Sequence, residues 1–181
     1  MKKTTKRQML IAIGIALNVI GAFIAMTFSI PFYMDSIGTI LIAGLLGPKY
    51  AMLTGVLGSL SSGVLFDVYS FYYAPVQLLT GFFAGILYHT SWLKGWKTLI
   101  GSILIGVPTS IASAIITACL FQGITSGSSS AIVVILHHFG MNLVLSIFIV
   151  QVFTDYMHKL LAVIFTKMVI QRGKLEERWR I

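Results

Sequence analysis

The chain has 181 residues, of which 57% are hydrophobic and only 10% are charged, whereas soluble domains carry about 25% charged residues. A sequence this apolar cannot cover its surface with polar groups, so an ordinary soluble domain is excluded and a protein dissolved in lipid is predicted. The length predicts one membrane domain over residues 1–181. The single cysteine, Cys119, excludes an intrachain disulfide framework.

The net charge of +8 is distributed as in a membrane protein rather than as in a nucleic-acid-binding protein. Twelve of the thirteen Lys and Arg residues fall before the first apolar run, in alternate breaks between runs, or at the end of the chain from Lys167 onward, and Lys159 is the exception. This is the positive-inside pattern of multi-pass proteins. We therefore expect a multi-pass cell-membrane protein with cytoplasmic N- and C-termini, the lipid bilayer as its surroundings and no nucleic-acid partner.

Apolar runs predict the helices in chain order. The first, Met9 to Phe28, has the roughly 20 residues that a transmembrane helix needs. The second, Ile37 to Leu46, is too short to cross alone and stops at Gly47-Pro48, because helices end before proline. Further runs cover residues 51–66, 76–88 and 98–121, separated by an aromatic outer loop at 67–75 and a basic turn at 92–97, with a flexible outer loop at 122–130.

The last region holds two apolar stretches, 131–153 and 156–170, on either side of Asp155. If both crossed the membrane, the basic tail after them would lie on the outer side. An even number of crossings is therefore expected, and six is the count that fits, with part of 131–153 re-entrant or lying along the outer surface. The predicted fold is an all-α integral membrane protein, a six-transmembrane-helix bundle with a ligand cavity open to the outer side.

Two outer loops combine aromatic residues with an acid, Tyr33 with Asp35, and Asp67 with three tyrosines. Irregular backbone at membrane depth persists only where protein or a water-filled cavity covers it. Rings with a few convergent polar groups are typical of a small-molecule site. Two other interpretations stay open: the aromatic residues anchor the interface, or Asp35 or Ser36 caps the helix that follows. The candidate substrate-binding residues are Tyr33, Asp35, Asp67, Tyr69, Tyr73, Gln77, His137 and Asn142.

Polar residues inside the apolar runs are few, and each has a structural explanation beside a functional one. Asn18 is expected to form an interhelical hydrogen bond. His137 and His138 are adjacent, so at most one of them can face a cavity, and their spacing does not predict a metal site. Asp155 and Lys159 are spaced i, i+4 and are expected to pair with each other.

Catalytic motifs are not found in this sequence: there is no Walker P-loop, no GxSxG, no HExxH and no plausible Ser-His-Asp set. We expect no enzymatic activity of its own and no cofactor. The chain is predicted to be a membrane-embedded binding subunit that needs a partner. The alternative is a membrane scaffold or sensor module without a transported ligand. Such a module needs an output domain, and only ten residues follow Gln171, which favours the binding subunit.

The first apolar run carries small residues on two faces. Ala12 and Ala16 share one face, whereas Gly14, Asn18 and Ala22 occupy another. Small residues four apart allow close helix approach. From the sequence alone, either face could meet a sister helix or another protein.

Several segments together resemble the S-components of energy-coupling factor (ECF) transporters, the small membrane proteins that bind vitamins. They are the Ala12-xxx-Ala16 pair after a basic N-terminus, "YMDSIGTILIAGLLGPKYAMLTGVLGSL" (33–60), "APVQLLTGFFAGIL" (74–87), "GITSGSSS" (123–130) and Asp155-xxx-Lys159. The likeness covers nearly the whole chain. The last motif departs slightly, with Tyr156-Met157-His158 where a more apolar spacer is expected.

The resemblance implies a protein of the bacterial cell membrane, a six-helix bundle with an outward-facing vitamin pocket. It implies as partners an ECF transmembrane scaffold subunit and two ECF ATPase subunits, whose ATP hydrolysis drives import. By the same resemblance Ala12 and Ala16 contact the scaffold subunit, and the S-component topples in the membrane with its ligand.

Within the family, the chain is most similar to members assigned to hydroxymethylpyrimidine or vitamin B6, with pantothenate and cobalamin as alternatives. A small aromatic ring suits stacking on Tyr33, Tyr69 or Tyr73, with its polar edge held at Asp35, Gln77 or Asn142. A carboxylate ligand needs a basic group, and Lys159 is expected to be paired already. A neutral or cationic ring is therefore the prediction.

Overall fold

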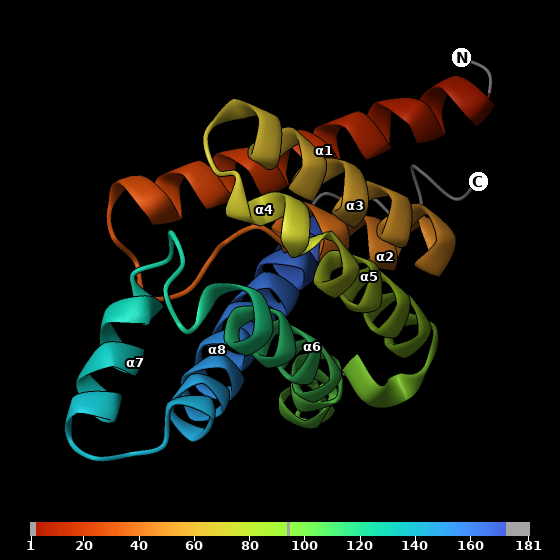
Figure 1. The fold of residues 1–181 in the computed structure, drawn as a ribbon. Coiled ribbons are helices and arrows are strands. Elements are labelled where there is room, and N and C mark those ends of the chain that lie inside the picture. The colour runs from red at the N-terminus through yellow and green to blue at the C-terminus, as the bar shows by residue number, and fades with distance from the viewer. Residues whose placement is uncertain (1–2, 94, 173–181) are drawn as a thin grey trace.

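The structure, a computed structural model, describes residues 3–93 and 95–172, and within these ranges its regular elements are all helices, with no strand (Figure 1). The elements in chain order are α1 (Lys3–Thr27), α2 (Ile37–Leu46), α3 (Pro48–Leu65), α4 (Tyr69–Tyr72), α5 (Ala74–His89), the 3-10 turn η1 (Ser91–Leu93), α6 (Lys97–Phe121), α7 (Ser129–His138) and α8 (Leu143–Arg172). Of these helices, α1, α6 and α8 are long and apolar enough to cross a membrane.

The predicted helices of residues 1–121 are confirmed to within a few residues, and α2 has the predicted bounds. The largest shift is at α1, which begins six residues before Met9 and carries Lys3, Lys6 and Arg7 on its first turns, because Lys and Arg are good helix formers. Pro48 and Pro75 each occupy the first turn of a helix, where backbone N–H groups have no partner within the helix, so the missing N–H of proline costs no hydrogen bond.

The division of the last region at Asp155 is wrong. The chain breaks instead at 139–142, where Gly140 has a φ of +90°, and α8 then runs unbroken through Asp155. An acid does not end a buried helix when a lysine one turn later accompanies it, and Lys159 does so here. Six crossings remain a prediction. Lys2, Lys94 and the basic residues Lys174, Arg178 and Arg180 lie outside the described residues.

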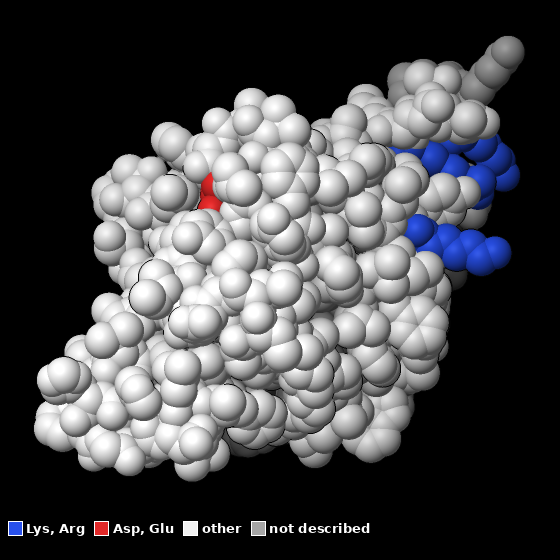
Figure 2. Space-filling model, in the orientation of Figure 1, with Lys and Arg blue, Asp and Glu red and all other residues white. Residues whose placement is uncertain are grey.

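Basic residues gather at one end of the bundle. The Arg7 guanidinium donates a 3.3 Å hydrogen bond to the Tyr50 hydroxyl, which joins the starts of α1 and α3. Lys167 contacts the Thr98 hydroxyl, which joins the end of α8 to the start of α6. Figure 2 shows the visible Lys and Arg side chains clustered at this end, and only a small acidic spot elsewhere on that face. We call it the basic end.

The acidic loops meet at the opposite end. The rings of Phe23 and Phe66, at the ends of α1 and α3, lie edge to face with centroids 5.5 Å apart. Tyr33 and Asp67 join the two loops there by a hydrogen bond. Between the two ends lies an apolar core contributed by α2, α3, α5, α6 and α8, whose fully buried members include Ile40, Ala43, Ala51, Ala84, Ile105 and Val163. This core separates the acidic loops from the basic end.

Asn18 and Gly38 hold α1 and α2 in direct backbone contact. The Asn18 Oδ1 accepts hydrogen bonds from the N–H groups of Gly38 (2.7 Å) and Thr39 (3.2 Å), and its amide donates to the Thr39 hydroxyl (2.7 Å). The predicted interhelical hydrogen bond of Asn18 is therefore confirmed. A Cβ on Gly38 would lie 1.8 Å from the Gly14 carbonyl oxygen, so no side chain fits at position 38 without moving a helix.

Gly38→Ala is expected to destabilise the protein strongly, at or above the upper end of the roughly 1–3 kcal/mol typical of overpacked cores. The matched control is Gly106→Ala in α6, where the new Cβ meets its nearest atom at an ordinary 3.6 Å. Thermal unfolding of the detergent-solubilised variants measures the difference. Equal melting temperatures would contradict the tight contact between α1 and α2.

Candidate ligand-binding cavity

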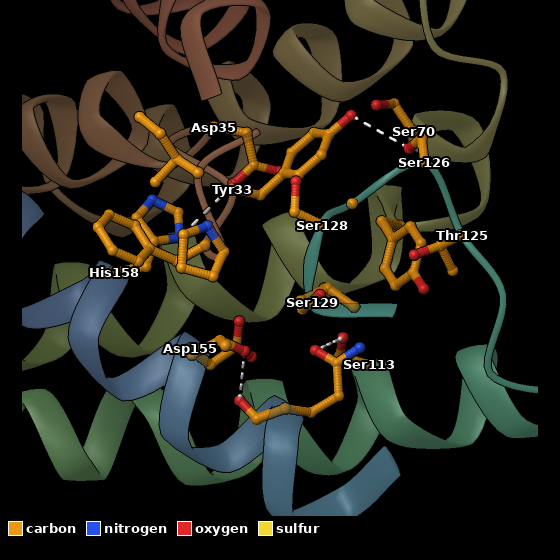
Figure 3. Close-up of a pocket in the computed structure, with 18 of the residues that line it drawn as sticks. Tyr33, Asp35, Ser70, Ser113, Thr125, Ser126, Ser128, Ser129, Asp155 and His158 are labelled. Carbon is orange, nitrogen blue, oxygen red and sulfur yellow. Dashed lines mark hydrogen bonds and ion pairs between the residues drawn. The ribbon is translucent and has the colours of Figure 1, made fainter. Parts of the chain in front are cut away.

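A cavity of about 80 Å³ lies at the acidic end of the bundle (Figure 3). The loop between α1 and α2 and the serine-rich segment 125–129 cover it, while α5, α6 and α8 form its walls. A buried water needs roughly 10–15 Å³ of such space. The cavity is therefore large enough for a small ring-sized ligand, and most of its lining is polar or aromatic.

The covering loop of residues 28–36 is held flat against α1. A Cβ on Gly21 would lie 2.1 Å from the Met34 carbonyl oxygen, so only glycine allows the loop to approach this closely. The Tyr33 hydroxyl then donates a 2.5 Å hydrogen bond to Asp67 and lies 3.3 Å from the Ser126 hydroxyl. Tyr33 thus joins three covering segments. Burial, followed by the hydrogen bond to Asp67, raises the pKa of the Tyr33 phenol above its ordinary value, which keeps the phenol a donor.

Asp67 organises the turn that leads into α4. Its carboxylate accepts hydrogen bonds from Tyr33, from the Ser70 hydroxyl at 2.8 Å and from the Tyr69 N–H at 3.3 Å. The Ser59 hydroxyl fixes the same turn through the Ser70 carbonyl at 2.5 Å. Three protein donors already use the Asp67 oxygens, so this acid holds the cavity wall in place.

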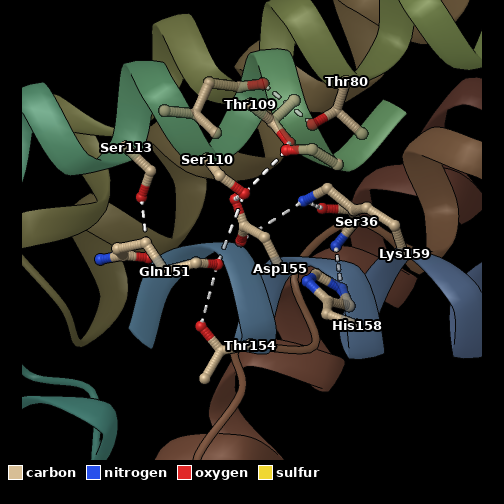
Figure 4. Close-up of polar contacts among 12 residues, drawn as sticks. Ser36, Thr80, Thr109, Ser110, Ser113, Gln151, Thr154, Asp155, His158 and Lys159 are labelled. Atoms are coloured by element: carbon tan, nitrogen blue, oxygen red, sulfur yellow. Dashed lines mark hydrogen bonds and ion pairs between the residues drawn. The ribbon is translucent and has the colours of Figure 1, made fainter. Parts of the chain in front are cut away.

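Lys159 is the charged centre of the opposite wall (Figure 4). Its side chain is 2% exposed, and its ammonium lies 3.2 Å from the Ser36 hydroxyl and 4.0 Å from Asp155. The predicted pair of Asp155 and Lys159 is confirmed. The Ser36 hydroxyl also accepts a 3.0 Å hydrogen bond from the Gln77 amide and donates to Asp35 at 3.2 Å. Ser36 occupies the N-cap position of α2, but its hydroxyl is engaged in the cavity and makes no side-chain cap, so the capping alternative is wrong for Ser36.

His158 connects the same network to the backbone of the loop. Its Nε2 accepts a 3.3 Å hydrogen bond from the Ser36 N–H, so the neutral ring carries its proton on Nδ1. That Nδ1 lies 3.8 Å from the Asp35 carboxylate, beyond hydrogen-bonding distance. Burial raises the pKa of Asp35 above its usual value, and the charge of Lys159 opposes the shift.

Five of the eight candidate substrate-binding residues line this cavity: Tyr33, Asp35, Asp67, Tyr73 and Gln77. The Tyr73 hydroxyl is 2.6 Å from Thr117 on α6, and the Gln77 amide is engaged with Ser36. They come together because the two loops and the start of α5 meet at the same end of the bundle.

The other three candidates lie outside the cavity. Tyr69 packs edge to face on Phe121, with ring centroids 4.9 Å apart. His137 is exposed at the end of α7, and its Nδ1 lies 2.9 Å from the Met141 carbonyl oxygen. Asn142 accepts a 2.9 Å hydrogen bond from the Val144 N–H at the start of α8. The break at 139–142 carries His137 and Asn142 away from the cavity.

Several lining residues were not among the candidates, above all those of α8. They are Ser113, Thr125, Ser126, Ser128, Ser129, Gln151, Thr154, Asp155, His158 and Lys159. The sequence contained a signal for the α8 members. Polar residues occur at positions 151, 155 and 159, four apart, with two more at 154 and 158, and this spacing places them along one stripe of an apolar helix. The hydroxyls of 125–129 had none, since serine-rich loops are common.

Within the described residues, no group of three or more His, Cys, Asp or Glu side chains could hold a metal ion. No protein-family model, curated protein or solved structure matches this chain. The function of the site is therefore argued from its own residues. They place hydrogen-bond donors and acceptors around a small chamber between helices. Such a chamber suits reversible binding of a small polar molecule.

Proposed function

We propose that this chain is the membrane-embedded, high-affinity binding subunit of an ATP-driven ECF vitamin importer. The observation that carries the proposal is the polar cavity at the acidic end, closed off from the basic end by an apolar core. A membrane scaffold subunit and two ATPase subunits supply the energy, because the sequence holds no nucleotide-binding motif. The resemblance to S-components points to the same division of labour.

In this proposal the basic end faces the cytoplasm and the cavity faces outward. The positive-inside rule supports this orientation, since the starts of α1, α3 and α6 and the end of α8 all carry basic residues. The six crossings are α1, α2, α3, α5, α6 and α8, with α7 lying along the outer surface. Short α2 crosses only part of the bilayer, and the irregular loop before it covers the ligand.

The proposed ligand is a small aromatic vitamin or precursor, with hydroxymethylpyrimidine and vitamin B6 first. Tyr33 and Tyr73 provide aromatic surface, and Gln77 and Gln151 provide amide groups. The cavity volume of about 80 Å³ favours one small ring over cobalamin, whose corrin is many times larger.

The outward face of α1 is the proposed docking face for the scaffold subunit. Ala12 and Ala16 are exposed, whereas Gly14, Asn18 and Ala22 are buried against the neighbouring helices. The structure thus assigns the second face to internal packing. Within the described residues, no other helix covers the first face. Its small residues would allow a helix of another protein to approach α1 closely in lipid.

Native mass spectrometry of the detergent-solubilised chain tests the binding role. We expect the wild-type chain to retain one small molecule. Ser129→Phe places a large ring in the cavity lining and should abolish retention. Ala131→Phe, two residues further along on the exposed side of α7, is the control and should retain the molecule. If the wild type retains nothing and binds none of hydroxymethylpyrimidine, vitamin B6, pantothenate and cobalamin, the proposal fails and the scaffold or sensor alternative replaces it.

A further inference from the structure

The cavity contains more acidic than basic groups. Every Asp or Glu among the described residues, namely Asp35, Asp67 and Asp155, lines it, and Lys159 is the only Lys or Arg of these residues that does. Charged groups in an apolar surrounding are costly unless they are paired. The question is therefore what compensates the excess negative charge.

Asp67 needs no further partner, because three protein groups donate to it. Asp35 and Asp155 do. The Asp35 carboxylate accepts hydrogen bonds from the Ser36 hydroxyl at 3.2 Å and from the Gln77 side chain. The Asp155 carboxylate accepts them from the Ser110 hydroxyl at 3.3 Å and from the Thr109 side chain. All four donors are uncharged. A carboxylate has about four lone-pair sites, so each acid can still accept a further, charged donor.

Lys159 balances only one of these two acids. Its ammonium has three N–H donors, and among the described residues it reaches one hydrogen-bond acceptor, Ser36, with Asp155 at 4.0 Å. His158 does not supply the missing charge, because its Nε2 accepts a backbone hydrogen bond and the ring is therefore neutral. Asp35, Asp155 and Lys159 together leave one unit of negative charge beside the cavity, while the separate charge of Asp67 is held at the turn before α4 by three neutral donors.

Buried donors without a full set of acceptors accompany the free carboxylates. Lys159 is 2% and His158 3% exposed, and both line the cavity. Among residues 3–93 and 95–172, the His158 Nδ1–H has no hydrogen-bond acceptor, and the Asp35 carboxylate lies 3.8 Å from it. A bound molecule that satisfies this wall must carry donors with positive charge for the two acids and also an acceptor for the two α8 donors. The aromatic residues Tyr33 and Tyr73 also line the cavity.

We infer that the ligand is a small aromatic ring bearing a protonated amino group, which binds Asp35 and Asp155, and a neighbouring acceptor that faces Lys159 and His158. This inference rests on the proposed function and narrows it: cationic rings are favoured, uncharged rings bind more weakly, and carboxylate compounds such as pantothenate are rejected. Lys159 balances one acid and so keeps the site selective for a single positive charge.

Three probes with one ring test the charge: pyridoxamine with a protonated amine, pyridoxine with an alcohol and 4-pyridoxate with a carboxylate. Calorimetry on the full detergent-solubilised chain is expected to show pyridoxamine binding about tenfold or more tighter than pyridoxine, with 4-pyridoxate weakest. The wild-type series alone decides the sign of the preference, so the result does not depend on any variant folding.

Two isosteric variants separate charge recognition from structure. Asp155→Asn is expected to reduce the preference for pyridoxamine over pyridoxine to near unity, because the remaining acid and Lys159 then balance. Asp67→Asn, whose oxygens serve the turn before α4, is expected to weaken all three probes by a similar factor. A selective loss at position 67 and not at 155 would overturn the assignment of the two acids.

The outcomes also distinguish this inference from the proposed function. Equal binding of the three probes, or preference for 4-pyridoxate, overturns the cationic ligand and leaves the importer subunit standing. If none of the three probes binds, the inference is overturned, and the retained-molecule experiment above decides the proposed function by itself.

Discussion

Lys159→Met is expected to destabilise the protein by about 3–5 kcal/mol, the loss typical of removing one partner from a buried ion pair. The lysine side chain is 2% exposed and lies in the middle of α8. Its removal leaves Asp35 and Asp155 without a cation and removes a donor to Ser36. For a protein of this size the loss corresponds to a fall in melting temperature of roughly 10 °C, measurable by fluorescence-detected unfolding in detergent.

A second substitution tests whether charge is the cause. Lys159→Met combined with Asp155→Asn removes both members of the pair, so it is expected to recover part of the lost stability. Lys49→Met removes a lysine that is exposed at the start of α3 and should leave the melting temperature nearly unchanged. If the double variant is as unstable as the sum of its parts, packing of the lysine stem rather than pairing holds this region together.

Ala12→Trp or Ala16→Trp is expected to abolish uptake in cells that also contain the proposed scaffold and ATPase subunits, while ligand binding by the isolated chain stays intact. Both alanines are exposed on α1, far along the helix from the loop that covers the cavity. An indole placed there separates two helices that small residues allow to touch. Accumulation of labelled ligand measures uptake, and calorimetry on the purified variants measures binding.

Ile100→Trp on α6 is the matched control, since this residue is 51% exposed on another helix. It should leave both uptake and binding unchanged. Uptake that survives both alanine substitutions would show that the docking face is elsewhere. Loss of binding together with uptake would instead show that the indole disturbs the fold of α1.

Much of the fold was predictable because the sequence signals of membrane helices are local. A run of apolar residues, a Gly-Pro break or a basic turn is read within a few positions, so the apolar helices up to Phe121 lie nearly where the sequence predicts them. The short helix α4 (Tyr69–Tyr72) lies within the segment 67–75, which the sequence predicts as a loop. The break at 139–142 was missed because Gly140 and Asn142 are weak turn signals beside an aspartate inside an apolar run. The sequence favours Asp155 as the boundary, although Lys159 accommodates its charge within the helix.

The site was predictable only in part, for a different reason. The polar and aromatic character of the predicted outer loops indicated Tyr33, Asp35 and Asp67 as site residues. The stripe of Gln151, Asp155 and Lys159 was visible as spacing, but the spacing alone does not say what the stripe faces. Only the packing of α8 against the start of α2, where Lys159 reaches Ser36, turns it into a wall of the cavity.

The amino-acid sequence by itself determined the lipid environment, the helical class, the short α2 and the separation of basic from acidic ends, since each follows from hydropathy and charge along a few consecutive residues. The tertiary structure alone decided which polar groups share one chamber and which face of α1 is left outward. These depend on contacts between residues far apart in the chain, such as Ser36 with Lys159 and Gly14 with Gly38, and on the close helix approach that glycine permits. No local pattern specifies a contact of that kind.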